Sequence, residues 1–172
     1  MLTNDHILTT INRIIYDSPL DADLQSTDVA LLNSFPINEV IAILLDMFYR
    51  EKDVIVKSKI YNAILSIKSF DTVRLLLDIF EQSSIDWRTV YCRSLSKFRD
   101  SRAIDKLCSV LFEGTDSNMR YVAAESLAEI GDSTAISALE YAQNNDIGED
   151  FEGFPVAEMA RDSLIKIINR IG

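Results

Sequence analysis

Apolar residues recur with a spacing of three or four through almost the whole 172-residue chain. This spacing places them on one face of a helix. We expect amphipathic helices over residues 3–16, 20–34, 37–50, 54–68, 71–82, 86–98, 101–113, 117–130, 133–143 and 155–171. Most of these segments are separated by only a few residues, so the pattern predicts antiparallel helix pairs and an all-α fold.

Residues suited to helix starts stand at several of the predicted boundaries. Asp53, Asp86 and Asp116 (or Ser117) each precede a second helix, where a short polar side chain can cap free N–H groups. Proline is favoured in the first turn of a helix. Ser18-Pro19, Pro36 and Pro155 fit this preference at three further helix starts.

The chain contains a repeat of about 32 residues. LLDMF at 44–48 returns as LLDIF at 76–80, and residues 88–107 overlay residues 120–139 at the same shift of 32. Residues 56–69 join this set at a shift of 31, and residues 156–167 align at a shift of 37, the extra length falling in NNDIGEDFEGFP at 144–155. A repeat of two helices cannot bury its apolar face alone, so neighbouring repeats must stack. We therefore predict an α-solenoid in a single domain, residues 1–172, with helix pairs 3–34, 37–68, 71–98, 101–130 and 133–171.

One copy of the repeat carries a sharper motif. MRYVAAESLAEIGDSTAISALEYA at 119–142 resembles a HEAT-type repeat, in the short version found in phycobilisome lyases and many bacterial proteins. The third pair matches in part, with Phe98-Arg99-Asp100 in place of Ile-Gly-Asp. The resemblance implies a HEAT/armadillo-like superhelix in which the second helix of each pair lines the concave face.

Charge is distributed unevenly along the chain. The net charge is −10, and residues 113–172 hold 12 of the 27 acidic but only 4 of the 17 basic residues. Such a surface repels nucleic acid and attracts basic partners. We expect a basic protein as partner, with no nucleic acid and no membrane; solubility is the other interpretation of this acidity.

The repeat pattern leaves three positions of each second helix pointing outward. On the last two pairs these positions are acidic or aromatic, with the exception of Lys166, and residues 144–154 add carboxylates beside them. We predict one acidic docking surface in which carboxylates pair with Lys or Arg and aromatic side chains act as anchors. Its residues are Tyr121, Glu125, Glu129, Asp146, Glu149, Asp150, Phe151, Glu152, Phe154, Glu158 and Asp162.

Two alternatives stay open for these features. The 144–154 segment is equally compatible with a mobile insertion in which Phe154 packs beside Pro155. On the third pair Arg93 and Lys97 form a possible secondary basic patch, within a cluster that is equally suited to internal pairing.

No constellation typical of catalysis or metal binding is visible. His6 is the only histidine, and two cysteines, Cys92 and Cys108, make neither a disulfide framework nor a metal site. Asn144, Asp146, Gly148 and Asp150 stand at alternate positions, as in a calcium loop, but the glycine and bidentate glutamate of an EF-hand are missing. We expect no catalytic residues, no cofactor and no metal.

The function most consistent with these features is non-catalytic protein binding. Small acidic HEAT-like proteins resemble toxin-immunity proteins, so the resemblance implies an inhibitor that neutralises a basic toxin domain such as a nuclease. The alternatives are a phycobiliprotein lyase-like subunit or chaperone, and a general scaffold or DNA-binding HEAT-like protein. We see no signal peptide and no long apolar run, so we expect a cytoplasmic protein, with a monomer favoured.

Overall fold

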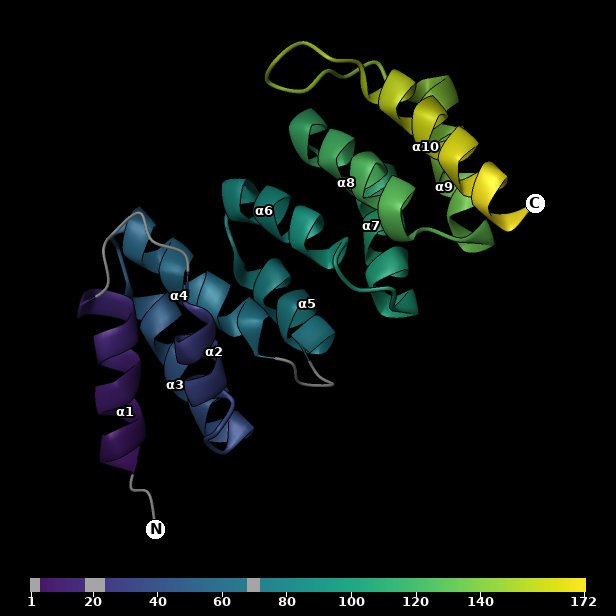
Figure 1. The fold of residues 1–172 in the computed structure, drawn as a ribbon. Helices are drawn as coiled ribbons and strands as arrows, with labels where there is room; N and C mark the ends of the chain where they lie inside the picture. Colours follow the sequence, from purple (N-terminus) through teal and green to yellow (C-terminus); the bar gives the residue numbers. More distant parts are fainter. Residues whose placement is uncertain (1–3, 18–23, 68–71) are drawn as a thin grey trace. The chain divides into compact units, whose positions relative to one another are not determined.

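The computed structural model describes residues 4–17, 24–67 and 72–172, and most of these residues are helical (Figure 1). Among them the only β pairing is one isolated bridge between Glu149 and Pro155. The predicted all-α fold is therefore confirmed. Chain contacts divide the protein into two compact units, residues 1–72 and 73–172. The prediction of a single domain stays a prediction.

The first unit contains four α-helices within its described residues. They are α1 (Asn4–Asn12), which continues as a π-helical turn (Arg13–Asp17), α2 (Ser26–Leu32), α3 (Ile37–Arg50) and α4 (Val54–Ser66). α3 packs against α1 and α4. Their facing sides bury large apolar residues such as Ile11, Leu44 and Ile60, all with no exposed surface. Asp53 caps α4, as predicted, by accepting hydrogen bonds from the N–H groups of Ile55 and Val56.

The second unit positions the candidate site. It contains α5 (Thr72–Gln82), whose first residue precedes the unit boundary, α6 (Ile85–Leu95), α7 (Ser101–Glu113), α8 (Ser117–Ile130), a 3₁₀ turn (Ser133–Ala135), α9 (Ile136–Asn145) and α10 (Val156–Ile171). α8 packs against α6 on one side and α10 on the other, while α7 packs against α9 (Figure 1). The second helices therefore form one layer and the first helices another, which is the stacking expected of a solenoid.

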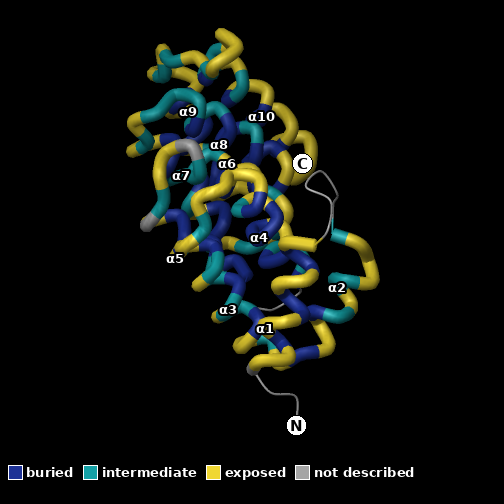
Figure 2. Tube along the Cα trace, turned by 90° about the vertical axis from the view of Figure 1, so that its left-hand side faces the viewer, coloured by how far each residue is buried: buried dark blue, intermediate teal, exposed yellow. Residues whose placement is uncertain are grey.

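Where the two layers pack against each other, each helix buries its apolar side. Buried positions alternate with exposed ones along the helices of the second unit (Figure 2). Small residues let α8 approach its neighbours closely: Ala123 and Ala124 have no exposed surface, and Ala128 is 3% exposed. The core between the two layers is completed by Leu107, Leu127 and Ile167, which are also fully buried.

Two equivalent serines tie successive repeats together. Ser126 on α8 donates a hydrogen bond to the Cys92 carbonyl on α6, at 3.0 Å. Ser163 on α10 donates to the Ala124 carbonyl on α8, at 2.8 Å. Both the donors and the acceptors occupy corresponding positions in consecutive copies of the repeat. The sequence repeat is thus matched by a repeated contact between second helices.

Arginines satisfy the carbonyl groups that helix ends leave without partners. Arg88 on α6 donates to the carbonyls of Phe80, Glu81 and Ser83 at the end of α5. Arg120 is the corresponding residue of α8 and donates to the Gly114 carbonyl after α7, at 2.8 Å. Arg170 does the same from α10 for α8, with the carbonyls of Ala128, Glu129 and Gly131 as acceptors.

Most predicted helices agree with the structure to within one to three residues, and two details need correction. Of the predicted helix 20–34, the described residues 24–34 form α2, which begins at Ser26 and ends at Leu32; residues 18–23, with Ser18 and Pro19, lie outside the described residues. Asp86 lies inside the first turn of α6, because the N-cap residue is Ser84. Cys92 is buried and Cys108 half-buried, and both are free thiols.

No single helix among the described residues is long and apolar enough to cross a membrane. α2 and α3 reach the required length and hydropathy only when counted together, and the chain bends by 113° between them.

Candidate functional site

The segment between α9 and α10, residues 146–155, forms a short hairpin. Glu149 and Pro155 make the isolated bridge, and the Asp150 N–H donates to the Phe154 carbonyl at 3.0 Å. At its base the Val156 N–H donates to the Gly148 carbonyl, also at 3.0 Å. The residues that lengthen the last copy of the repeat therefore form a hairpin held by its own backbone hydrogen bonds.

Asp150 and Gly153 build the tip of the hairpin. The Asp150 carboxylate accepts hydrogen bonds from the N–H groups of Glu152 and Phe154, both at 2.9 Å. Gly153 has a φ of +88°, a left-handed conformation that glycine adopts without steric cost. This turn displays aromatic side chains rather than burying them: Phe151 is 81% and Phe154 52% exposed. Phe154 thus keeps about half of its surface in contact with the protein, and the alternative interpretation, in which it packs beside Pro155, stays a prediction.

A hydrogen bond near the hairpin tip joins the hairpin to the first residue of α8. Ser117, the first residue of α8, donates from its hydroxyl to the Glu149 carbonyl at 2.5 Å. Tyr121 lies one helical turn further along the same face. The hairpin tip is thereby held near Tyr121.

Four carboxylates from three elements lie close enough to Tyr121 for their negative charges to act on its hydroxyl group. Its pKa is raised, first by partial burial and then by the negative charges of nearby carboxylates. We define the acidic surface as Tyr121 with these carboxylates: Asp150 and Glu152 of the hairpin, Glu125 of α8 and Asp162 of α10. The structure thus brings together the residues that the sequence predicts at the core of the docking surface.

Two of these carboxylates already have a cationic neighbour. Glu125 pairs with Arg93 of α6 at 3.1 Å, and Asp162 pairs with the adjacent Arg161 at 3.2 Å. All four side chains are about half exposed, between 45% and 66%, so water weakens both pairs. Among the described residues Glu152 forms no ion pair.

A small cleft continues the acidic surface toward α6. It has a volume of about 190 Å³ and is lined by Arg93, Ser96, Glu125, Ser126 and Glu129. Arg93 therefore lines this cleft as the partner of Glu125, and the secondary basic patch of Arg93 and Lys97 stays a prediction. Lys97 is exposed.

The basic cluster around Arg93 and Lys97 also contains Arg88, Arg99, Arg102 and Lys106. Most of these side chains are engaged within the protein. Lys106 pairs with Glu81, and Arg102 pairs with Asp100. Arg88 binds helix-end carbonyls. These contacts favour the interpretation in which the cluster pairs internally.

The remaining predicted residues lie around the acidic surface. Glu129, Glu149 and Glu158 are exposed. Glu158 stands in the first turn of α10, where a carboxylate suits the helix dipole. Phe151 and Phe154 extend the surface along the hairpin tip.

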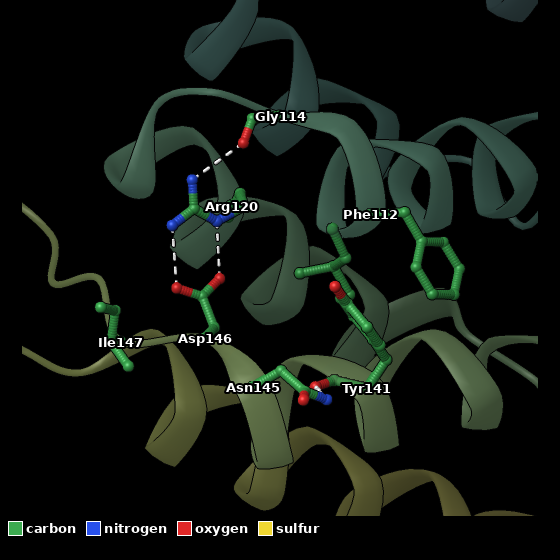
Figure 3. Close-up of a pocket in the computed structure, with 8 residues that line it drawn as sticks. Phe112, Gly114, Arg120, Tyr141, Asn145, Asp146 and Ile147 are labelled. Carbon is green, nitrogen blue, oxygen red and sulfur yellow. Dashed lines mark hydrogen bonds and ion pairs between the residues drawn. The ribbon is translucent and has the colours of Figure 1, made fainter.

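Asp146 is the exception, because it is not available to a partner. Its carboxylate forms a bidentate ion pair with Arg120, at 2.6 Å and 2.8 Å (Figure 3). The two side chains are only 7% and 17% exposed. The hydrogen bond from Arg120 is the main cause that lowers the pKa of Asp146. Asp146 is therefore a structural residue beneath the hairpin, and we remove it from the docking surface.

A second hollow lies beside this ion pair. It has a volume of about 220 Å³ and is bordered by the rings of Phe112 and Tyr141, 5.1 Å apart, and by Ile147 (Figure 3). Sequence reasoning does not identify this hollow, nor the roles of Ser117, Arg120 and Gly148. The recurrence of Arg88 as Arg120 is the signal that points to a structural role for the arginine.

The calcium alternative finds no support in this geometry. Asp146 faces Arg120, and Asp150 accepts backbone N–H groups. Within the described part of the chain, no group of three or more His, Cys, Asp or Glu side chains is arranged to hold a metal ion.

Comparison with known proteins agrees with the repeat architecture. The family model described as HEAT repeats matches residues 73–149, which lie wholly within the second unit. No curated protein and no solved structure matches the chain. The match supports a HEAT-like repeat protein, and arrays of this kind offer extended surfaces for protein interaction or scaffolding.

Proposed function

We propose that this protein is a non-catalytic binding module that docks a lysine- or arginine-rich protein on its acidic surface. In its finer form the proposal is that the partner is a basic toxin domain, such as a nuclease, which the module neutralises. One observation carries the proposal: four carboxylates from α8, α10 and the hairpin lie close enough to the half-buried Tyr121 for their charges to raise its pKa.

The surface combines two features that protein interfaces use. Carboxylates steer a basic partner and set its orientation, and exposed aromatic side chains supply apolar contact. Phe151, at 81% exposure, stands at the tip of the hairpin beside Asp150 and Glu152. A lysine or arginine of the partner can also lie over the Tyr121 ring.

The surrounding charge supports a basic protein over nucleic acid. Of the four basic residues in 113–172, Arg120 and Arg161 are paired with aspartates and Arg170 binds helix-end carbonyls. The twelve acidic residues of this region therefore dominate its field. Carboxylates placed in this way can occupy the positions of phosphates in a nucleic-acid groove, which is how the module would block a nuclease.

The test is capture of the partner by two matched variants of the full chain. The first variant reverses three charges of the acidic surface: Glu125→Lys, Glu152→Lys and Asp162→Lys. The control reverses three exposed carboxylates of the first-helix layer: Asp105→Lys, Glu113→Lys and Glu140→Lys. Both variants change the net charge equally, so a partner attracted only by overall charge is weakened equally by both.

We expect the wild-type protein and the control variant to capture the same basic protein, and the surface variant to fail to capture it. Its affinity should fall by at least about 100-fold in the surface variant, because each lost charge contact costs on the order of 1 kcal/mol or more. The association rate should fall as salt concentration rises. Equal retention by all three proteins, or equal loss from both variants, would contradict the proposed site.

The purified partner then tests the finer proposal. If it cleaves nucleic acid, and cleavage stops at one equivalent of wild-type protein but not of the surface variant, the partner is a nuclease held inhibited. A partner that carries pigment would indicate a lyase-like role instead. A partner without enzymatic activity would indicate a scaffold.

A further inference from the structure

The Arg120–Asp146 ion pair ties three segments of the second unit together. Asp146 ends α9 and begins the hairpin, and its Oδ1 also accepts the Gly148 N–H at 2.9 Å. Arg120 belongs to α8, and its Nη1 donates to the Gly114 carbonyl after α7. One guanidinium thus joins the end of α7, the first turns of α8 and the root of the hairpin (Figure 3).

Gly148 lets the hairpin lie close against α8. A Cβ atom at this position would stand 2.6 Å from Cβ of Ser117 and 2.7 Å from Nη2 of Arg120. Both distances are too short for any side chain, so the approach requires glycine. The next residue, Glu149, accepts the hydrogen bond from Ser117.

These contacts set where the hairpin tip stands. The root of the hairpin, meaning residues 146–148 next to α9, is fixed by the ion pair of Asp146. Glu149 is held by Ser117, which lies one helical turn before Tyr121 on α8. Asp150 and Glu152 follow within three residues. If the root shifts, both carboxylates move away from Tyr121, whereas Glu125 and Asp162 stay on their helices.

We propose that Arg120, Asp146 and Gly148 are positioning residues, which hold the hairpin carboxylates beside Tyr121 and so complete the surface that binds the partner. The consequence for binding rests on the proposed function. The positioning itself does not, and it can be measured on the isolated protein.

Two variants shift the root by different means. Asp146→Asn weakens the ion pair and keeps the shape of the side chain. Gly148→Ala leaves every charge in place and introduces a clash with α8. The control is Asp100→Asn, which weakens another aspartate–arginine pair, that with Arg102 at the start of α7.

The first measurement is the titration of the Tyr121 hydroxyl, monitored by NMR in protein whose tyrosine rings are isotopically labelled. The Tyr121→Phe variant identifies which signal belongs to Tyr121. Burial and the charges of Asp150, Glu125, Glu152 and Asp162 hold its pKa above the usual value. In both root variants we expect this pKa to fall, because two of the four carboxylates move away from Tyr121.

The second measurement is the rate of amide hydrogen exchange at Glu152, Phe154 and Val156. We expect exchange to become faster on the order of tenfold in the root variants, as the loss of one hydrogen-bond contact allows. Asp100→Asn should change neither.

The third measurement is the affinity of each variant for the partner that the wild-type protein captures. We expect both root variants to lose about tenfold in affinity while the control keeps it. An unchanged Tyr121 titration in both variants would overturn the positioning role. A lowered Tyr121 pKa with unchanged affinity would overturn the link to binding. If the charge reversals of the acidic surface have no effect on any partner, the proposed function fails, whatever the titration shows.

Discussion

At the scale of single residues, the carboxylate of Asp146 depends on a partner far along the chain. It is buried against Arg120 of another helix, 26 positions away. Asp53 and Asp116, in contrast, cap their helices through residues only two or three positions away, and both caps are found as predicted. Composition alone does not distinguish a carboxylate that meets a distant arginine from one that meets water, which is why the sequence predicts Asp146 on the surface.

Asp146 should make the protein sensitive to acid. A carboxyl with a lowered pKa contributes stability that is present above its usual pKa of 3.8 and is lost as the pH falls through the lower, folded-state value. Asp146→Asn should lower the free energy of unfolding by about 3 kcal/mol at pH 7, as expected when a buried pair loses one partner. Urea unfolding from pH 7 down to pH 3 measures both proteins. The difference between them should shrink below the usual aspartate pKa; a constant difference would show that the charge of Asp146 is unimportant.

The two cysteines should react slowly. Burial raises the pKa of Cys92 to about 12 and that of Cys108 to about 11, in the latter case with help from Asp105 and Asp132. Thiolate is the reactive form, so at pH 7.5 Ellman's reagent should modify Cys92 at least about 1000-fold more slowly than free cysteine. Guanidinium chloride should restore the ordinary rate. A fast reaction in the native protein would mean that the α6–α8 contact opens readily.

At the scale of helices, periodicity predicted most of the fold. Apolar spacing marked α3, α7, α8 and α10 to within one residue, because each helix buries one continuous face against its neighbours. The repeat identified which helices are second helices, and α6, α8 and α10 do form one layer. The hairpin could not be predicted, because it depends on single backbone contacts at Asp150, Gly153 and Ser117 that have no period.

The hydrogen bonds between second helices should contribute to stability. Ser163 has no exposed surface and donates to the Ala124 carbonyl at 2.8 Å. Ser163→Ala should lower the free energy of unfolding by about 1 kcal/mol, the usual net value of one such bond. The control is Ser137→Ala on the exposed side of α9, which should change it by less than about 0.5 kcal/mol. Chemical denaturation measures both variants, and equal effects would show that the contact between repeats carries no net stabilisation.

At the scale of the whole molecule, the acidic surface and the HEAT-repeat match both fall within residues 73–172. The core of this unit is built from its own helices, with Leu107, Leu127, Leu139 and Ile167 fully buried. Because solenoid contacts run mainly between neighbouring repeats, a block of repeats can fold without the rest of the array.

The fragment 73–172 should therefore fold and keep the binding activity. We expect a helical circular dichroism spectrum and a single cooperative thermal transition, because about 100 residues in one contact unit are enough for two-state unfolding. Its affinity for the partner captured by the full chain should lie within about threefold of the full-length value, since Tyr121 and all four carboxylates are included. The fragment carrying the three surface reversals is the control and should not bind. A folded fragment without affinity would place part of the interface on residues 1–72, whereas an unfolded fragment would show that the second unit depends on the first for its stability.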